Sequence, residues 1–153
     1  MNLTHYEYLV SDDFLTYEFC SEGPNGRINK IVQFTLVRLP RYSYFNLAFG
    51  DLDEDRKLND FVTSNNHDAE KVLATVARAV ILFTDKYPDA LVFAEGSTIS
   101  RTRRYQMGIN KYWKEIEALF LVYGFVENFG FEAFRSGVNY KAFAVKRKKR
   151  NFI

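Results

Sequence analysis

The spacing of hydrophobic residues changes once along this chain, near residue 68, and that change limits the folds it can adopt. Before it, bulky and polar residues alternate over short runs such as Phe14–Ser21, which is typical of strands with one buried face. After it, apolar residues recur at helical spacing from Ala69 to Tyr87. The pattern therefore predicts a sheet built first along the chain, with helices packed on it afterwards.

The first half is predicted to form five strands. The segment from Glu22 to Gly26 reads Glu-Gly-Pro-Asn-Gly and is a strong turn signal, because glycine and asparagine tolerate positive φ. Pro40 ends the longest strand, whose alternation is irregular, so a bulge and a pair of shorter strands are both open. The acidic segment 51–57 is predicted to be a hairpin loop. The expected strands are Tyr6–Val10, Phe14–Ser21, Arg27–Leu39, Ser43–Gly50 and Leu58–Thr63.

The second half is predicted to contain two long helices. The first spans 69–87 and is capped by Asn65 or Asn66, and the second runs from about Ser100 to Tyr123, with Gly124 as its C-terminal cap. A short buried strand at 90–94 separates them, and a hairpin of segments 126–134 and 139–145 closes the chain. The order β-β-β-β-β-α-β-α-β-β predicts an α+β fold, with a mixed, mainly antiparallel sheet and two long helices.

Composition indicates one globular domain. The chain has 153 residues, of which 47% are hydrophobic and 17% aromatic, enough to bury a substantial core. We expect a single domain over 1–145 and a basic tail over 146–153. No apolar run reaches the ~18 residues that a membrane helix needs, and the start of the sequence does not resemble a signal peptide. With Cys20 as its single cysteine, the chain is predicted to be cytoplasmic and not associated with a membrane.

Charge is distributed unevenly along the chain. Residues 1–100 carry 9 basic and 15 acidic side chains, a balance of −6, whereas residues 101–153 carry 12 basic and 4 acidic side chains, a balance of +8. Such a division is typical of a surface that meets an anionic partner. One basic helix and the tail from Lys146 to Arg150, either solvated or in contact with phosphates, would also produce it.

The segment from Glu95 to Arg104 carries the strongest functional signal. It reads as the end of a strand, a tight turn and the first turn of a helix, where the partial positive charge of the helix disfavours cations. Three arginines nevertheless crowd that turn, and a bound anion would compensate them. Arg101 and Arg104 share a helical face, while Arg103 points elsewhere. The predicted ligand-binding residues are Gly96, Ser97, Thr98, Arg101, Arg103 and Arg104. Two other interpretations remain open: ion pairs with Glu95 and nearby acids, or solvated arginines.

Other polar motifs are weaker. His67 precedes the first helix and could act as an acid or a base, although a Ser/Asn-rich segment there is also ordinary capping chemistry. The acidic run 51–55 resembles the start of a calcium loop, but Arg56 stands where the loop needs glycine. No metal site and no cofactor is predicted. Aromatic residues at strand spacing could form a base-stacking surface, but they are more typical of a core.

Two resemblances add to this interpretation. The motif Gly-Ser-Thr-x-x-Arg-Thr-Arg-x-Tyr resembles a family of small uncharacterised bacterial proteins, and the resemblance covers most of the chain. It implies a domain without a known activity, in which an apolar residue commonly stands at the place of Arg104. The residues that carry the motif are Gly96, Ser97, Thr98, Arg101, Thr102, Arg103 and Tyr105.

The order of elements is similar to that of the Gcn5-related acetyltransferases. In that fold the phosphates of acyl-coenzyme A lie at the start of the first of these two helices, after a glycine-rich loop. The corresponding loop here, Thr63–Asp68, has neither glycine nor arginine. Tyr105 lies roughly where that fold often has its general acid, so the resemblance implies a catalytic role for this tyrosine.

Three functions follow as alternatives. The first is an anion-binding module, with a nucleotide, a nucleic acid or another phosphorylated ligand at the arginine-rich turn. The second is an acetyltransferase-like enzyme that uses acyl-coenzyme A, with Tyr105 or His67 as the catalytic candidate. The third is a structural or partner-binding domain, including a homodimer, in which the arginines form ion pairs.

Overall fold

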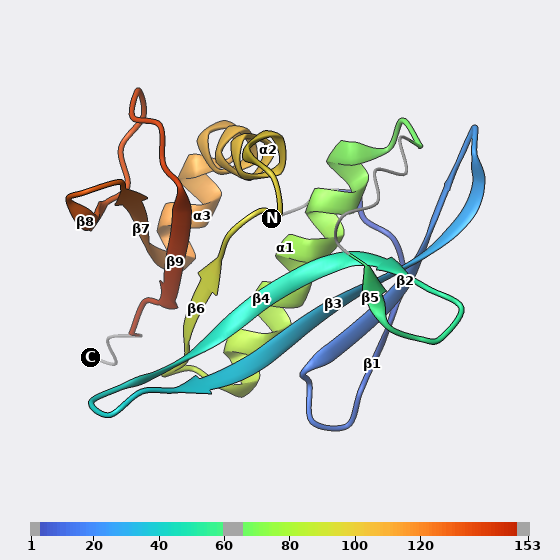
Figure 1. The fold of residues 1–153 in the computed structure, drawn as a ribbon, viewed down its shortest axis with the longest axis horizontal. Helices are drawn as coiled ribbons and strands as arrows, with labels where there is room; N and C mark the ends of the chain where they lie inside the picture. Colours follow the sequence, from blue (N-terminus) through green and yellow to red (C-terminus); the bar gives the residue numbers. More distant parts are fainter. Residues whose placement is uncertain (1–3, 60–65, 150–153) are drawn as a thin grey trace.

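One mixed sheet organises the chain, which the computed structural model describes over residues 4–59 and 66–149 (Figure 1). Within these residues the sheet has nine strands in the order β1-β2-β3-β4-β6-β9-β7-β8, and β5 pairs with β4 beside this path. All neighbouring strands are antiparallel except β4 and β6, which are parallel. The predicted α+β class, with a mixed and mainly antiparallel sheet, is confirmed.

Within the described residues, the N-terminal half follows the predicted strands closely, and residues 60–63 of the predicted fifth strand lie outside them. Gly23 pairs with Gly26 across a tight turn, and Gly26 has the positive φ of 84° that the turn signal anticipated. The long third strand pairs in continuous register with both neighbours, so it contains neither a bulge nor a break. The strands are β1 (Tyr8–Val10), β2 (Thr16–Gly23), β3 (Gly26–Arg38), β4 (Ser43–Leu52) and β5 (Leu58–Asn59).

The second predicted helix is interrupted at Tyr112, and its last residues, from Phe120, form a strand instead. The helical backbone breaks at Tyr112, with φ −110° and ψ 27°, and a strand begins at Phe120. Phe120 and Val122, two residues apart on that strand, both point into the core and are buried. In the sequence alone, the same residues also fit the apolar spacing of a helix. Seven elements follow residue 68: α1 (Ala69–Lys86), β6 (Leu91–Ala94), α2 (Ile99–Lys111), α3 (Trp113–Leu119), β7 (Phe120–Val126), β8 (Gly130–Ala133) and β9 (Ala142–Arg147).

Two predicted details of this region change with the break. Gly124 is not a helix cap but lies within β7, where the ring of Tyr140 packs so closely that a Cβ atom would lie 2.3 Å from its Cδ1. The first two residues of the predicted basic tail belong to β9. Arg147 is anchored there, because its guanidinium pairs with Asp85 at 2.9 Å and donates to Thr84 Oγ1 at 2.9 Å.

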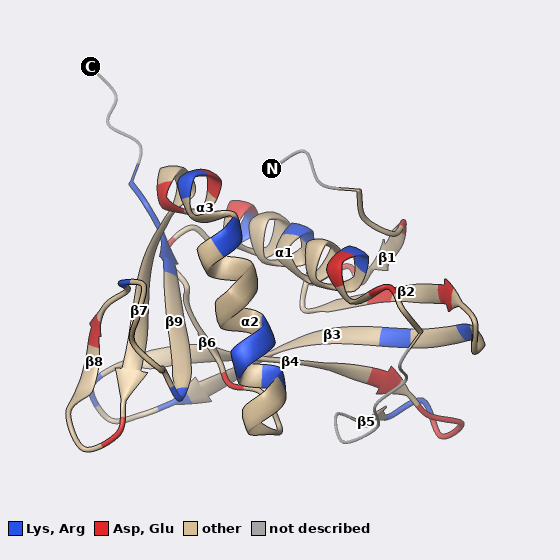
Figure 2. Cartoon of the chain, turned by 90° about the horizontal axis from the view of Figure 1, so that it is seen from above, with Lys and Arg blue, Asp and Glu red and all other residues tan. Residues whose placement is uncertain are grey.

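The helices leave one face of the sheet without helical cover. Helices α1 and α3 lie behind the sheet in Figure 1, and Figure 2 shows the same arrangement from above. Helix α2 is seen nearly end-on in Figure 1, above the carboxyl end of β6, so it runs across the edge of the sheet. No helix of the described segments is both long and apolar enough to cross a membrane.

The sheet consists of two halves that meet at one short ladder. β4 and β6 pair through Phe45–Val92, Asn46–Phe93 and Leu47–Ala94. Beyond these pairs, the same edge of β4 is taken by β5, which pairs with residues 51 and 52. The core divides accordingly. One cluster packs α1 on β1–β4, and the other packs α3 and the end of α1 on β7 and β9, with Val80 and Val145 touching both.

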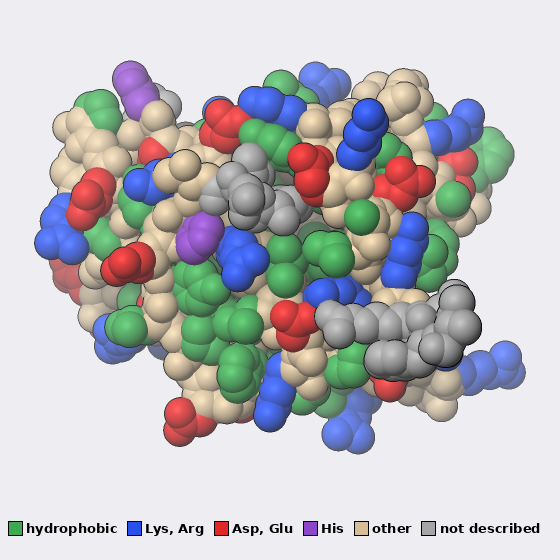
Figure 3. All heavy atoms as spheres, turned by 180° about the vertical axis from the view of Figure 1, so that it is seen from behind, with side chains coloured by type: hydrophobic (Ala, Val, Ile, Leu, Met, Phe, Trp, Pro, Cys, Tyr) green, Lys and Arg blue, Asp and Glu red, His purple; other side chains and the backbone are tan. Residues whose placement is uncertain are grey.

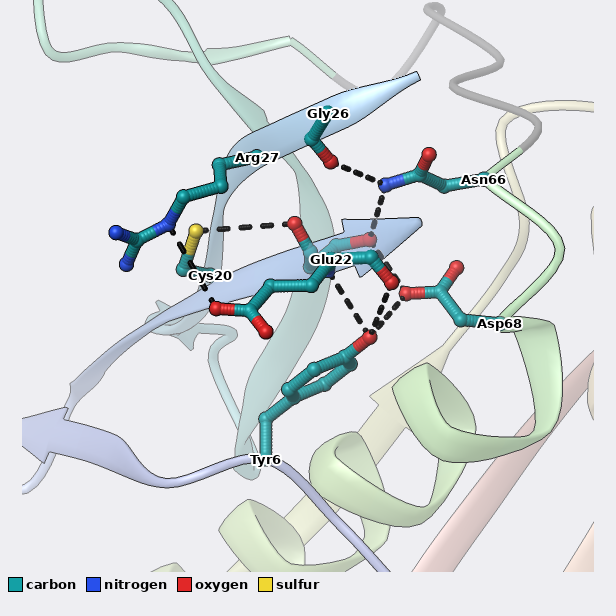
Figure 4. A network of polar contacts seen from close by, with 8 residues as sticks. Tyr6, Cys20, Glu22, Gly26, Arg27, Asn66 and Asp68 are labelled. Carbon is teal, nitrogen blue, oxygen red and sulfur yellow. Dashed lines mark hydrogen bonds and ion pairs between the residues drawn. The ribbon is translucent and has the colours of Figure 1, made fainter. Parts of the chain in front are cut away.

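A buried polar network attaches the β2–β3 hairpin to the start of α1 (Figure 4). The carboxylate of Asp68 accepts hydrogen bonds from Ser21 Oγ and, at 2.7 Å, from the Tyr6 hydroxyl. Asn66 Nδ2 donates to Ser21 Oγ and to the carbonyl of Gly26, both at 3.0 Å. Asn66 therefore anchors the hairpin instead of capping the helix as predicted, because Asp68 is the N-cap residue. The other predicted cap, Asn65, lies outside the described residues.

Two buried tyrosines allow this network to be tested. The Tyr6 hydroxyl donates to Asp68 and accepts from the backbone N–H of Glu22 at 3.0 Å. The Tyr17 hydroxyl has no hydrogen-bond partner among the described residues, and burial raises its pKa well above the ordinary value. Tyr6→Phe is expected to lower the free energy of unfolding by about 1–3 kcal/mol, whereas Tyr17→Phe should leave it unchanged or raise it. Urea unfolding measures both, and equal losses would contradict the assignment of the network.

Candidate functional site

The arginine-rich turn is held by its own backbone and two threonines. Thr98 is the N-cap of α2, and its Oγ1 accepts from the backbone N–H of Arg101 at 3.2 Å. The N–H of Gly96 donates to Thr102 Oγ1 at 3.1 Å, and that hydroxyl donates to the Thr98 carbonyl. A Cβ atom on Gly96 would lie 2.5 Å from the backbone nitrogen of Thr102. Gly96 therefore serves the close approach that the sequence suggested.

The three arginines of this turn have different surroundings. Arg103 lines a small polar cleft on one side of α2, and Arg104 lines a large apolar cavity on the other. Arg101 lines neither, and its guanidinium lies 3.4 Å from Ser97 Oγ. Among the described residues, no ion pair joins Arg103 or Arg104 to Glu95 or to any other carboxylate. The predicted cluster is thus divided between two sites.

The polar cleft has a volume of about 300 Å³ and lies between the turn and the segment 139–141. Gln106 fixes its base, because its amide donates to the Val138 carbonyl and accepts from the N–H of Tyr140. Arg103, Lys141 and Glu95 are its charged side chains, and Lys141 also pairs with Glu127 at 3.8 Å. Its remaining lining includes Gly96, Ser97, Thr98, Ile99, Thr102 and Asn139.

The larger site is an apolar cavity of about 910 Å³ between α1, α2 and the sheet. Its floor comes from β4, β6 and the C-terminal strands, and its two walls are helical. Figure 3 views the molecule from the side on which the helices lie, where hydrophobic side chains gather near the centre. Residues that define it are Leu47, Phe49, Val92 and Val145 in the floor, Leu73, Ala77 and Val80 from α1, and Tyr105, Gly108 and Ile109 from α2.

Helix α2 borders the cavity and packs on the second hydrophobic cluster through the partly buried Tyr105 and Ile109. Thr102 is the single buried residue of this helix. Gly108 faces α1, yet a Cβ atom placed on it would meet nothing closer than Leu73 Cδ1 at 3.9 Å. Protein interiors are normally packed to the density of organic crystals. An apolar space of about 910 Å³ has the size of typical ligand sites.

A polar cluster joins the two helices at the rim of the cavity. The Glu70 carboxylate on α1 accepts hydrogen bonds from Lys111 Nζ and, at 2.5 Å, from the Tyr112 hydroxyl. The bond from Lys111, followed by that from Tyr112, holds the pKa of Glu70 below its ordinary value. Lys111 is thus engaged by a carboxylate. Arg104 is exposed and has no ion-pair partner among the described residues, which makes the rim positive.

The two predicted catalytic candidates lie apart. Tyr105 lines the apolar cavity, with its ring centroid 5.8 Å from that of Phe49. His67 is exposed, has a left-handed φ of 58° and lines neither site. In residues 4–59 and 66–149, no group of three or more His, Cys, Asp or Glu side chains could hold a metal ion.

The cavity itself was not predicted from the sequence. The apolar residues of α2 recur at helical spacing, which predicts that they pack in the core. Whether they line a cavity instead depends on how far α2 lies from the sheet, which the sequence does not show. Gly108 was the one available signal, because a glycine in the middle of a helix costs stability and marks a position that helix propensity does not explain.

Comparison with known proteins identifies the family. The chain matches the model of a family of unknown function, DUF6934, over residues 2–148, and therefore belongs to that family. No curated protein and no solved structure gives a significant match.

Two glycines of α2 and its turn test the local geometry. Gly96→Ala is expected to destabilise the protein, because the new methyl group would collide with the backbone of Thr102. Gly108→Ala is expected to raise the free energy of unfolding by about 0.5–1 kcal/mol, because the helix gains propensity and the methyl group would meet Leu73 Cδ1 at an ordinary contact distance of 3.9 Å. Thermal and urea unfolding measure both variants. Destabilisation by Gly108→Ala would show that α2 lies closer to α1 than described.

Proposed function

We propose that this family member is a binding module for a small amphipathic organic anion, whose apolar part occupies the cavity between α1 and α2. The cavity of about 910 Å³ is the observation that carries the proposal. Ligand sites typically have volumes of about 300–1,000 Å³, with apolar walls and a few polar groups. The walls here are aliphatic and aromatic, and the polar groups gather at the rim, so the ligand has an apolar body with its charge at one end.

The position of the cavity in the sheet supports the same conclusion. Leu47 and Ala94 end the parallel pairing of β4 and β6, and both line the cavity. Ligands of α/β proteins commonly bind beyond the carboxyl ends of parallel strands. The start of α1 borders the same space through Ala69 and Glu70. The ends of the parallel strands, the start of α1 and the apolar floor therefore all border the same cavity.

Arg104 accounts for the expected negative charge of the ligand. The cavity lining also contains Lys111, but Glu70 already accepts a hydrogen bond from its amino group. Arg104 is free of such a partner among the described residues, and its planar guanidinium suits a carboxylate or a phosphate. In this proposal Arg104 binds the anion, as its position in the arginine-rich turn suggests, and the anion lies at the rim of the cavity.

An acyltransferase is the enzymatic alternative for the same cavity. One observation favours it: the strand order β4-β6-β9-β7, with β4 and β6 parallel, accompanies the order of elements that resembles the acetyltransferases. Tyr105 lines the cavity and is the candidate general acid. Acyl-coenzyme A is itself an amphipathic anion, so it belongs in the same binding experiment.

Calorimetric titration with decanoate, decanol and acetyl-coenzyme A tests the cavity. Gly108→Leu is expected to abolish binding by filling the space beside Leu73, whereas Gly108→Ala should retain it. Arg104→Gln is expected to weaken decanoate about tenfold and decanol little, because it removes one charge-assisted hydrogen bond. Arg103→Gln is the matched control. Binding of all three compounds by Gly108→Leu with unchanged affinity would contradict the proposal.

The polar cleft is a second candidate site, for a phosphate or the phosphate group of a nucleotide. The observation that favours it is Arg103, which lines the cleft beside the N-terminal turn of α2 and has no carboxylate partner among the described residues. Phosphate groups bind well at helix starts with adjacent guanidinium groups.

An amide NMR titration with inorganic phosphate and with nucleotides tests this second site. Shifts are expected at Gly96 to Thr98, and Arg103→Gln should remove them, while Arg104→Gln should not. Unchanged shifts in Arg103→Gln, or shifts confined to the cavity walls, would exclude the cleft.

A further inference from the structure

A row of aromatic rings crosses the face of the sheet that the helices leave uncovered. Tyr44 on β4 lies edge-on to Phe93 on β6, with ring centroids 5.8 Å apart. Phe93 in turn lies edge-on to Phe131 on β8 at 6.2 Å, and Phe131 to Phe125 on β7 at 5.2 Å. Tyr42 extends the row from the β3–β4 hairpin at 6.5 Å. The rings therefore form one continuous surface across several strands.

Small residues on β9 make this row possible. Ala144 pairs with Phe93 on one side and Tyr123 on the other, and Ala142 pairs with Phe125. Both alanines are buried beneath the larger side chains. The rings of β6 and β8 can therefore approach each other above β9 and β7, which lie between these two strands. Neighbouring positions such as Val92 and Val145 point to the opposite face, where they line the cavity.

Parts of this row remain accessible to solvent. Tyr42 is 59% exposed, Phe131 49% and Leu121 43%, and Tyr44 and Phe93 are half-buried. In a single chain, a contiguous apolar surface of this kind is typical of an interaction site. Edge-to-face contacts already hold the rings at fixed angles. A partner that binds to the exposed ring faces therefore costs little side-chain entropy.

The charge of this face identifies the kind of partner. Lys146 on β9 pairs with Leu91 and Leu121, so it projects from the same face as the rings. The register of the described strands β3, β4, β6, β9, β7 and β8 places no acidic side chain on this face, and its acidic residues, Glu18 and Glu22, lie on β2, on the far side of β3 from the rings. Arg41 precedes Tyr42 in the exposed hairpin, and Lys148 follows β9. Positive side chains therefore border the rings, whereas the acidic side chains of this face lie at its other end, on β2.

A second copy of the chain is a poorer match for this surface. Packing two such faces together would bury Lys146 against rings and alanines with no carboxylate to pair with, which is costly. The same penalty applies to an apolar protein partner. A single-stranded nucleic acid avoids it, because its bases stack on aromatic rings while its phosphates meet the cations.

We propose that the aromatic face formed by Tyr42, Tyr44, Phe93, Phe125 and Phe131, with Lys146, binds single-stranded nucleic acid without strong sequence preference. Bases stack on the exposed rings, and the backbone passes Lys146 and the basic β3–β4 hairpin. This surface is distinct from the cavity and from the polar cleft, so it can be tested separately from either.

Fluorescence anisotropy with labelled oligonucleotides of about 12 nucleotides tests the proposal, with DNA, RNA and a duplex of equal length compared. The intact chain is expected to prefer the single strands. Phe131→Leu keeps an apolar side chain but removes the ring, and should weaken binding about tenfold. Phe129→Leu is the matched control, because Phe129 is 88% exposed at the hairpin tip and belongs to no ring pair within the described residues.

Lys146→Gln is expected to reduce the slope of log affinity against log salt by about 0.7, as for one lost phosphate contact on a single strand. Lys114→Gln, on the exposed side of α3, should leave the slope unchanged. Gly108→Leu should also bind normally, which separates this outcome from that of the cavity.

Three results would overturn the proposal. The first is the absence of binding to any single strand at high micromolar protein. The second is equal loss of binding in Phe131→Leu and Phe129→Leu. The third is a wild-type dimer in sedimentation that Phe131→Leu converts to monomer, because the aromatic face would then be an interface between two copies.

Discussion

The whole arrangement depends on the short parallel ladder between β4 and β6. Three residue pairs join the two halves of the sheet, and each half has its own hydrophobic cluster. A parallel pair needs a crossover, which α1 provides by packing along both clusters. Beyond Ala94 the chain leaves the sheet, while β4 continues to Leu52 beside β5. The cavity lies where these two strands part, so it results from the topology and not from a local packing defect.

Helix α2 converts this divergence into two sites. It runs across the edge of the sheet and buries only Thr102, so its two sides face different surroundings. One side, with Arg103, borders the polar cleft, and the other, with Arg104 and Tyr105, borders the apolar cavity. The aromatic face is the third surface, formed by the open-face positions of the same strands whose opposite face forms the cavity floor. A single curved sheet therefore presents apolar surface on both of its faces.

The predictability of each part follows from the range of the interactions that form it. The β2–β3 turn and α1 were predictable, because Gly23–Gly26 and the apolar stripe of α1 are local signals. The start of β7 at Phe120 was not, since Leu119, Phe120 and Tyr123 fit a helix as well as a strand until β9 offers its pairing partners. The arginine turn was located correctly, but the separation of Arg103 from Arg104 depends on what packs on each side of α2. Aromatics such as Phe93 read as core because the sequence does not reveal which face of a sheet the helices cover.

The central claim, that the space between α1 and α2 is a ligand site, is tested most directly by nuclear Overhauser effects between a bound medium-chain carboxylate and the protein. Our account predicts contacts from the carbon chain of decanoate to the methyl groups of Leu73, Val80 and Ile109, with the carboxylate end close to the side chain of Arg104. Direct contacts between α1 and α2 that close the space, or ligand contacts confined to other surfaces, would contradict it.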